Sequence, residues 1–204
     1  MKHLEFEKQL RRMERDGVIT RKQFLQIMAV AGAFVALGTD KAYAAKSSAR
    51  GRIVIIGGGA AGISMASRLK RALADPDITI IDPSDKHFYQ PGFTLIGGGV
   101  YGKDDVWRKQ EDCMPKGVKW VKDVVTLVHP TLNKVDTANN GSIEYDFMVL
   151  APGVKYDWDR IEGITYKTIG QGNAHTIYDW RGAQLTWPAM QEFARKGGRG
   201  VFCD

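Results

Sequence analysis

The chain has 204 residues, of which 44% are hydrophobic, so it is long and apolar enough to bury a core. Its formal net charge is +6, and residues 1–44 contribute eight Lys and Arg and five Asp and Glu. The remaining residues hold 21 Lys and Arg and 18 Asp and Glu, which gives them a net charge of +3. So small a surplus excludes the electrostatic footprint of a nucleic-acid-binding protein. The sequence contains no internal repeat or low-complexity block.

The N-terminal segment has the order of a bacterial export signal. A basic stretch, TRKQFLQ (20–26), precedes the apolar run IMAVAGAFVALG (27–38), and AYA (42–44) offers a small-residue cleavage site. The apolar run is shorter than the roughly 20 residues of a membrane-spanning helix, and an uncleaved anchor is the alternative. TRKQFL resembles the twin-arginine consensus, with Lys22 where the second arginine usually stands. We therefore expect residues 1–44 to be an export signal and the protein to be periplasmic, at or near the inner membrane.

The segment RIVIIGGGAAGISMASRL (52–69) combines an apolar strand, a glycine turn and a helix. In such a unit Gly57 makes the tight turn, Gly59 lets the backbone approach a pyrophosphate, and Gly62 lets the helix pack closely on the strand. The helix N-terminus presents unpaired N–H groups to the anion. The next strand, ITIID, ends in Asp82, a carboxylate suited to ribose hydroxyls. The alternative is a glycine-rich turn without a ligand.

Beyond Asp82, residues 83–103 are rich in glycine and aromatic residues and have neither a helix nor a strand period. This pattern predicts a loop that runs along a bound cofactor, with an ordinary surface connection as the alternative. Short strands are predicted in residues 118–130, in NKVDT and in SIEYDFMVL, which ends in APG (151–153).

The C-terminal part has a different pattern. GAQLTWPAMQEFARKG (182–197) predicts an amphipathic helix with Pro188 near its start, and RGVFCD (199–204) predicts a strand in which Cys203 is buried. We expect this helix and strand to open a second α/β domain whose remainder lies beyond the chain. Neither Cys203 nor Cys113, which follows a polar KQED segment expected on the surface, has a metal-binding or C-x-x-C spacing.

The order of these motifs resembles that of the two-dinucleotide-domain flavoproteins, and longer segments are similar to the sulfide:quinone oxidoreductases, especially the mitochondrial-type branch. Those segments are DPSDKHFYQPGFTLIGGG (82–99), PKGVKWVKDVVTLVHPTLNKV (115–135), YDFMVLAPGVKYDWDRIEG (145–163) and TWPAMQEF (186–193). The resemblance implies an α/β fold in which residues 45–160 form a Rossmann-like FAD-binding domain, with a parallel sheet and a small antiparallel β insertion. It also implies that residues 161–204 connect to and begin a second dinucleotide-binding-like domain.

The resemblance also implies the FAD contacts. Asp82 would hold the adenosine ribose, Gln90 would meet the cofactor further along, and the backbone of Val125 would lie at the adenine. Ala151 and Gly153 would close over the dinucleotide. The residues implied around the pyrophosphate are Gly57, Gly59, Ala60, Ala61 and Gly62.

In the family that the chain resembles, a cysteine pair captures sulfide sulfur, a thiolate attacks the flavin, and electrons pass to a quinone or a cytochrome c. Those cysteines would lie beyond Asp204, so we expect no catalytic residue and no activity in the chain as given. Peripheral membrane contact would likewise come from segments beyond it.

Three alternatives stay open at this point. The flavoprotein subunit of flavocytochrome c sulfide dehydrogenase typically carries a flavin-linking cysteine in the loop where this chain has HFYQPGF. A type II NADH dehydrogenase shares the first domain but would use cytoplasmic NADH, which an export signal contradicts. The third alternative is a non-catalytic flavin-binding fragment.

Overall fold

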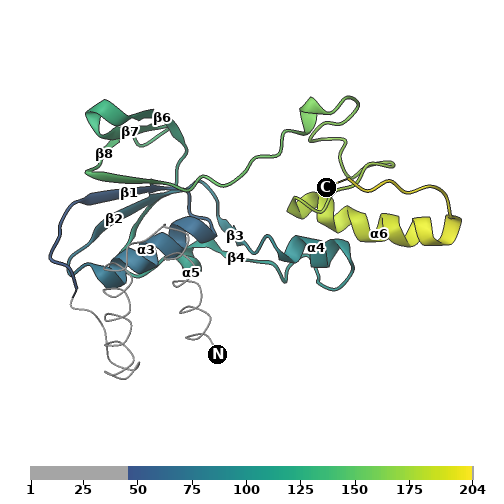
Figure 1. Cartoon of the computed structure of the whole chain (residues 1–204), viewed down its shortest axis with the longest axis horizontal. Coiled ribbons are helices and arrows are strands. Elements are labelled where there is room, and N and C mark those ends of the chain that lie inside the picture. Colours follow the sequence, from purple (N-terminus) through teal and green to yellow (C-terminus); the bar gives the residue numbers. More distant parts are fainter. Residues whose placement is uncertain (1–45, 204) are drawn as a thin grey trace, which may run out of the picture. The chain divides into compact units, whose positions relative to one another are not determined.

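The computed structural model describes residues 46–203, and the predicted export signal lies outside these residues. Residues from Ser47 onward group as one unit, and Figure 1 labels the elements of this part of the chain. The strands are β1 (Arg52–Ile56), β2 (Asp77–Ile81), β3 (Lys86–Phe88), β4 (Trp107–Lys109), β5 (Lys119–Val121), β6 (Val125–His129), β7 (Lys134–Thr137), β8 (Ser142–Glu144) and β9 (Phe147–Leu150). The helices are α3 (Ala60–Ala72), α4 (Gly92–Gly97), α5 (Gln110–Cys113) and α6 (Trp180–Lys196), with short 3₁₀ turns η1 (Pro130–Leu132) and η2 (Trp158–Arg160).

The central element is a four-stranded sheet in the order β5-β2-β1-β9, and each neighbouring pair is parallel. Strand β1 is the middle of the sheet, with Ile53 aligned to Ile78 on one side and to Phe147 on the other. Because all strands run the same way, their carboxyl ends meet at one edge, where ligands of such sheets bind. The predicted Rossmann-like fold is therefore confirmed.

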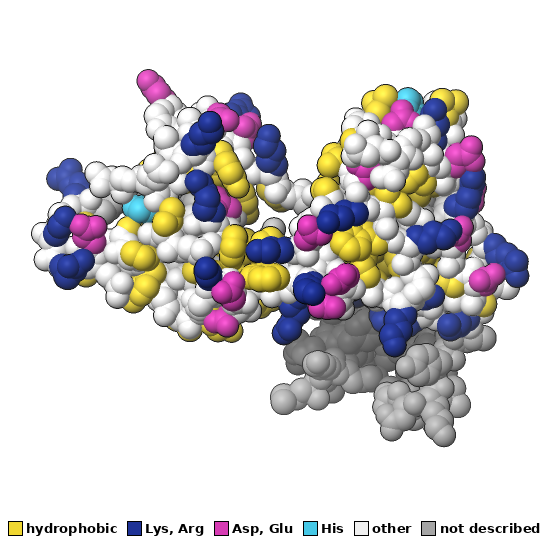
Figure 2. Space-filling view, turned by 180° about the vertical axis from the view of Figure 1, so that it is seen from behind, with side chains coloured by type: hydrophobic (Ala, Val, Ile, Leu, Met, Phe, Trp, Pro, Cys, Tyr) yellow, Lys and Arg dark blue, Asp and Glu magenta, His cyan; other side chains and the backbone are white. Residues whose placement is uncertain are grey.

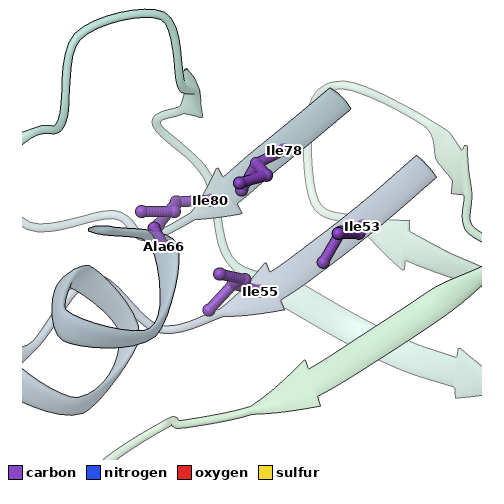
Figure 3. Close-up of a cluster of buried hydrophobic side chains, with 5 residues drawn as sticks. All are labelled: Ile53, Ile55, Ala66, Ile78 and Ile80. Atoms are coloured by element: carbon purple, nitrogen blue, oxygen red, sulfur yellow. The ribbon is translucent and has the colours of Figure 1, made fainter. Parts of the chain in front are cut away.

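One face of this sheet packs on helix α3. Strands β1 and β2 alternate their side chains between the two faces, as a period of two requires. The side chains buried against α3 form the cluster in Figure 3, which consists of Ile53, Ile55, Ala66, Ile78 and Ile80. Ala66 is completely buried, and its small side chain lets the helix lie close to the strands.

The opposite face carries the predicted antiparallel insertion. Strands β6, β7 and β8 form a three-stranded antiparallel sheet. Its Val135 and the nearby Tyr145 pack against Val54 of β1 and Ile81 of β2. The parallel sheet is thus covered by α3 on one side and by a smaller sheet on the other, which leaves its carboxyl edge as the place for a site.

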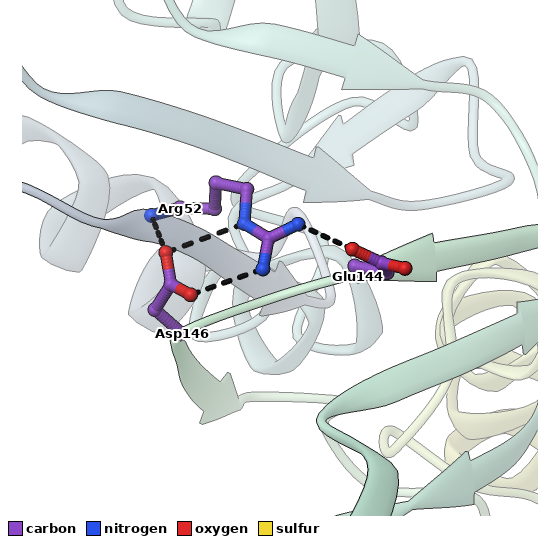
Figure 4. A network of polar contacts seen from close by, with 3 residues as sticks. All are labelled: Arg52, Glu144 and Asp146. Atoms are coloured by element: carbon purple, nitrogen blue, oxygen red, sulfur yellow. Dashed lines mark hydrogen bonds and ion pairs between the residues drawn. The ribbon is translucent and has the colours of Figure 1, made fainter.

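Arg52, at the start of β1, is bound by two carboxylates near the start of β9 (Figure 4). Its guanidinium donates to Asp146 at 3.0 Å and to Glu144 at 2.6 Å, and its backbone N–H donates to Asp146 at 2.7 Å. The hydrogen bonds from Arg52 lower the pKa of Asp146 below its ordinary value. These contacts fix the register of β9 against β1, which in turn places the residues that follow β9.

Asp123 closes the turn between β7 and β8. This buried carboxylate accepts backbone N–H groups from Val124, Asn139 and Asn140, and it also accepts both asparagine side-chain amides. Burial alone would raise the pKa of Asp123, but the hydrogen bonds, led by the one from the Asn140 side chain, outweigh it and hold this pKa well below its usual range.

We expect this carboxylate to make the melting temperature sensitive to acid. Because the pKa of Asp123 is lower in the folded chain than its unfolded value of about 3.9, its stabilisation is complete above that pH and is lost as the pH falls toward the folded pKa. Thermal melts from about pH 6 down to about pH 3 should show a steeper fall for the wild type than for Asp123→Asn. Parallel curves would contradict this account.

Residues 83–103, predicted to be a loop, contain strand β3 and helix α4 instead. The reason lies in contacts with distant residues: β3 pairs with β4, and Phe93 and Ile96 of α4 pack against Val106 and Ala183. No periodicity within residues 83–103 could reveal these partners.

The C-terminal part also differs from the sequence prediction. Pro188 lies in the interior of α6 rather than near its start, because the helix begins at Trp180, capped by Asp179, whose side chain accepts the Gly182 N–H at 2.6 Å. Residues 197–203 form no strand, and Cys203 is exposed rather than buried.

On the face shown in Figure 2, the described basic and acidic side chains are interspersed. Within residues 46–203, none of the helices is long and apolar enough to span a bilayer.

Candidate functional site

The glycine turn joins β1 to α3 at the carboxyl edge of the sheet. Gly57 has a positive φ of 102°, and a Cβ at this position would lie 2.0 Å from Ala151 O. A Cβ at Gly62 would lie only 1.9 Å from Gly57 O. Neither position has room for a side chain, so these glycines set the close approach of α3 and β9 to β1.

Gly59 differs from both, because a Cβ there would meet nothing within 4 Å. It is the N-cap of α3, its side-chain position is exposed, and no described acidic side chain or side-chain cap occupies the first turn. The first intrahelical bond runs from Ile63 N to Gly59 O, so the N–H groups of Ala60, Ala61 and Gly62 have no partner within the helix. Ala60 and Ala61 are exposed, whereas Gly62 is buried. A helix start of this kind binds anions such as phosphate.

Asp82 follows β2 directly and lies beside the turn. One carboxylate oxygen accepts the Gly58 N–H at 2.6 Å, and the other accepts the Ser84 N–H at 2.7 Å. Trp120 Nε1 donates to the backbone oxygen of Asp82 at 2.9 Å and so fixes its position. A carboxylate has about four acceptor sites, so Asp82 retains capacity for hydroxyl donors.

Ala151 follows β9, and its N–H donates to Ile56 O at 2.8 Å, next to the glycine turn. Gly153 is exposed, has a positive φ of 76°, and a Cβ there would meet nothing within 4 Å. Together with the turn and Asp82, these residues line the same edge of the sheet.

Two further predicted residues are not brought into contact with the turn. Gln90 is exposed in the connection between β3 and α4, where its backbone oxygen accepts the Phe93 N–H. Val125 opens β6 and packs with the cluster that includes Val54 and Ile81.

The sequence prediction missed Gln110. It belongs to the KQED segment that we expected on the surface, yet Gln110 is only 2% exposed, and its amide donates to Gly58 O at 2.7 Å. His87 Nδ1 lies 3.3 Å from the same oxygen. Nothing in the local pattern reveals Gln110, because its burial depends on strands distant in sequence.

Comparison with known proteins identifies the family. The sequence pattern of the pyridine nucleotide-disulphide oxidoreductases matches residues 51–187, which include the glycine turn, Asp82 and Ala151. The chain belongs to this family. Its members are FAD-dependent oxidoreductases.

Comparison with individual proteins narrows the similarity to one type of enzyme, the sulfide:quinone oxidoreductases. The chain is 39% identical over 152 residues to the mitochondrial sulfide:quinone oxidoreductase of Dictyostelium discoideum and 34% identical over 154 residues to that of Mus musculus. Both matches cover 74% of this chain and 33% of the relative. The crystal structure of the sulfide:quinone oxidoreductase of Aquifex aeolicus superimposes with a TM-score of 0.56 at 25% identity, covering 75% of this chain and 33% of that one. The resemblance drawn from the sequence motifs is therefore confirmed.

The comparison corrects one prediction. The expectation of an exported, periplasmic protein is wrong, because the relatives from Dictyostelium discoideum, Mus musculus and Schizosaccharomyces pombe are mitochondrial enzymes. An apolar run after basic residues satisfied the local pattern of an export signal, but such a pattern is shared by other N-terminal segments.

The described residues fit the FAD of this family. The uncapped start of α3 offers N–H donors for a pyrophosphate, and the open space at Gly59 allows the close approach that a pyrophosphate needs. Asp82 supplies an acceptor on the next strand.

Proposed function

We propose that the protein containing this chain is a sulfide:quinone oxidoreductase, which oxidises sulfide and passes the electrons through FAD to a quinone. The observation that carries the proposal is the 39% identity over 152 residues with the enzyme of Dictyostelium discoideum. The chain spans about a third of the length of such relatives, so activity, substrate and acceptor are proposed for the whole protein.

The same comparison favours this proposal over a type II NADH:quinone oxidoreductase. The enzyme of that name from Staphylococcus aureus is 27% identical over 118 residues, which is a lower identity over a shorter match. The flavocytochrome alternative is disfavoured because the segment HFYQPGF (87–93) lacks the flavin-linking cysteine typical of that enzyme.

The roles of the site residues are part of the proposal. The N–H groups of α3 would hold the pyrophosphate, Asp82 would accept ribose hydroxyls, and Gln90 would contact the cofactor further along. The other proposed contacts are Gly57, Gly59, Ala60, Ala61, Gly62, the Val125 backbone, Ala151 and Gly153. When bound, the isoalloxazine accepts the two electrons of sulfide oxidation and releases them to a one- or two-electron acceptor.

Neither described cysteine is proposed to capture sulfide. Cys113 ends α5 and is half-buried, and Cys203 is exposed in a segment without regular structure. We propose that the sulfur-capturing cysteines and any peripheral membrane contact belong to segments beyond Asp204, and that residues from 161 onward open a second dinucleotide-binding-like domain. The FAD-binding domain would comprise residues 45–160.

The test follows the flavin absorbance of the purified protein under anaerobic conditions. Sulfide is expected to bleach the flavin band, and a soluble quinone analogue is expected to restore it. Cys113→Ser serves as the control and should leave both steps unchanged. Bleaching by NADH but not by sulfide would overturn the proposal in favour of an NADH dehydrogenase, and reoxidation by cytochrome c but not by quinone would overturn the proposed acceptor.

A further inference from the structure

The carbonyl of Gly58 contacts two side chains that lie far from the glycine turn in sequence. Nε2 of Gln110, the first residue of α5, donates to this carbonyl at 2.7 Å, and Nδ1 of His87 on β3 lies 3.3 Å from it. Gly58 is itself buried, and a Cβ on it would lie 2.2 Å from Gln110 Nε2. The amide of Gln110 therefore lies directly beneath the turn.

The antiparallel pair of β3 and β4 places this amide. Lys86 of β3 aligns with Lys109 of β4, and the next residue, Gln110, donates its backbone N–H to Asp85 O at 2.8 Å. The side chain of Gln110 is thus bonded to the glycine turn, and its backbone is bonded to the connection between β2 and β3. A buried side-chain amide is retained in a core only when its polar atoms are satisfied, and here the Gly58 carbonyl accepts from it.

We propose that Gln110 is a positioning residue for the FAD pyrophosphate, a role that rests on the proposed FAD site. The peptide bond is planar and trans, so the Gly58 C=O and the Gly59 N–H point in opposite directions. When Gln110 holds the carbonyl on the buried side, the Gly59 N–H faces the open space in front of α3. Gln110 therefore orients a donor toward the phosphate without touching it.

The neutral amide is the group that this role requires. In Gln110→Glu the side chain keeps its shape, but an ionised carboxylate only accepts hydrogen bonds and would face the carbonyl oxygen of Gly58. The peptide would then turn away, and the Gly59 N–H would leave the phosphate. Protonation restores an O–H donor, and burial favours the protonated form.

Other titratable groups face this position and must be separated from the introduced carboxyl. They are Asp82, which accepts the Gly58 N–H, His87, and Asp85, which is paired with Lys122. The Met side chain in Gln110→Met has a similar volume and no titratable group. Any change of its FAD affinity with pH therefore comes from these neighbouring groups alone. Each variant is compared with the wild type at the same pH.

The experiment measures FAD affinity of the protein by flavin fluorescence at about pH 8 and about pH 5.5, together with the melting temperature without FAD. Loss of one hydrogen bond to the turn is expected to weaken FAD binding about tenfold in Gln110→Met at both values. Gln110→Glu should be weakened by at least as much at the higher pH and should recover to near wild-type affinity at the lower pH.

Wild-type affinity of Gln110→Met at both values would overturn the positioning role. A Gln110→Glu variant that is weakened equally at both values would overturn it as well, since a packing defect is not reversed by protonation. If Gln110→Glu does not fold at the higher pH, the FAD affinity of Gln110→Met alone tests the positioning role. Wild-type protein that binds no FAD would instead overturn the proposed function and this role with it.

Discussion

Gly59→Val is expected to abolish FAD binding in a chain that still folds. The backbone of Gly59 has φ −70° and ψ −172°, which any residue adopts, and a Cβ there meets nothing within 4 Å. The valine would fill the space that a pyrophosphate needs and would keep the phosphate from the N–H groups of α3. Loss of about two hydrogen bonds to a charged group corresponds to a loss of at least about 100-fold in affinity.

Flavin absorbance of the purified variant measures the occupancy, and a thermal melt of the apoprotein measures folding. Gly98→Ala is the matched control, because its nearest contact would be an ordinary 3.4 Å to Thr94 O at a distant helix end. Full flavin occupancy in Gly59→Val would show that the cofactor does not lie at the start of α3.

Gly62→Ala, in contrast, is expected to lower the stability of the fold itself. Its Cβ would lie 1.9 Å from Gly57 O. Gly57 cannot easily retreat, because its N–H donates to Ile81 O at 2.9 Å and its carbonyl lies between β1 and α3. Overpacking of this kind costs up to about 3 kcal/mol, which corresponds to a melting temperature lower by roughly 10 °C.

Gly59→Ala is the matched control for this second substitution. It adds the same methyl group to the same helix start, three residues earlier and in open space. Its apoprotein should melt like the wild type. Equal melting temperatures for Gly62→Ala and Gly59→Ala would contradict the close packing of α3 on β1.

The parts of the fold that the sequence predicts correctly are those whose signals are local. The strand, the glycine turn, the helix and Asp82 follow one another within a few tens of residues, and at Gly57 and Gly62 a side chain would collide with backbone oxygens. Alternating apolar residues and turn residues likewise predict the strands β6 to β9.

The errors occur where a residue is defined by distant partners. Gln110 looks like a surface residue within KQED and is buried because β3 and β4 carry it under the glycine turn. Helix α4 lacks a clear period because its apolar side chains pack on α6. Cys203 looks like part of a strand, but none of the described strands pairs with that segment. Local pattern alone cannot supply such contacts.

The position of β1 between β2 and β9 has a consequence for synthesis of the protein. The contacts between the start of β1 and the start of β9 join residues separated by 94 positions, whereas β2 follows β1 after a single helix. At synthesis rates of about 5–20 residues per second, the second edge of β1 stays unpaired for roughly 5–20 s after β1 is made. An unpaired apolar edge is a template for pairing with other chains, so we expect the nascent chain to be prone to such pairing in the interval before β9 emerges.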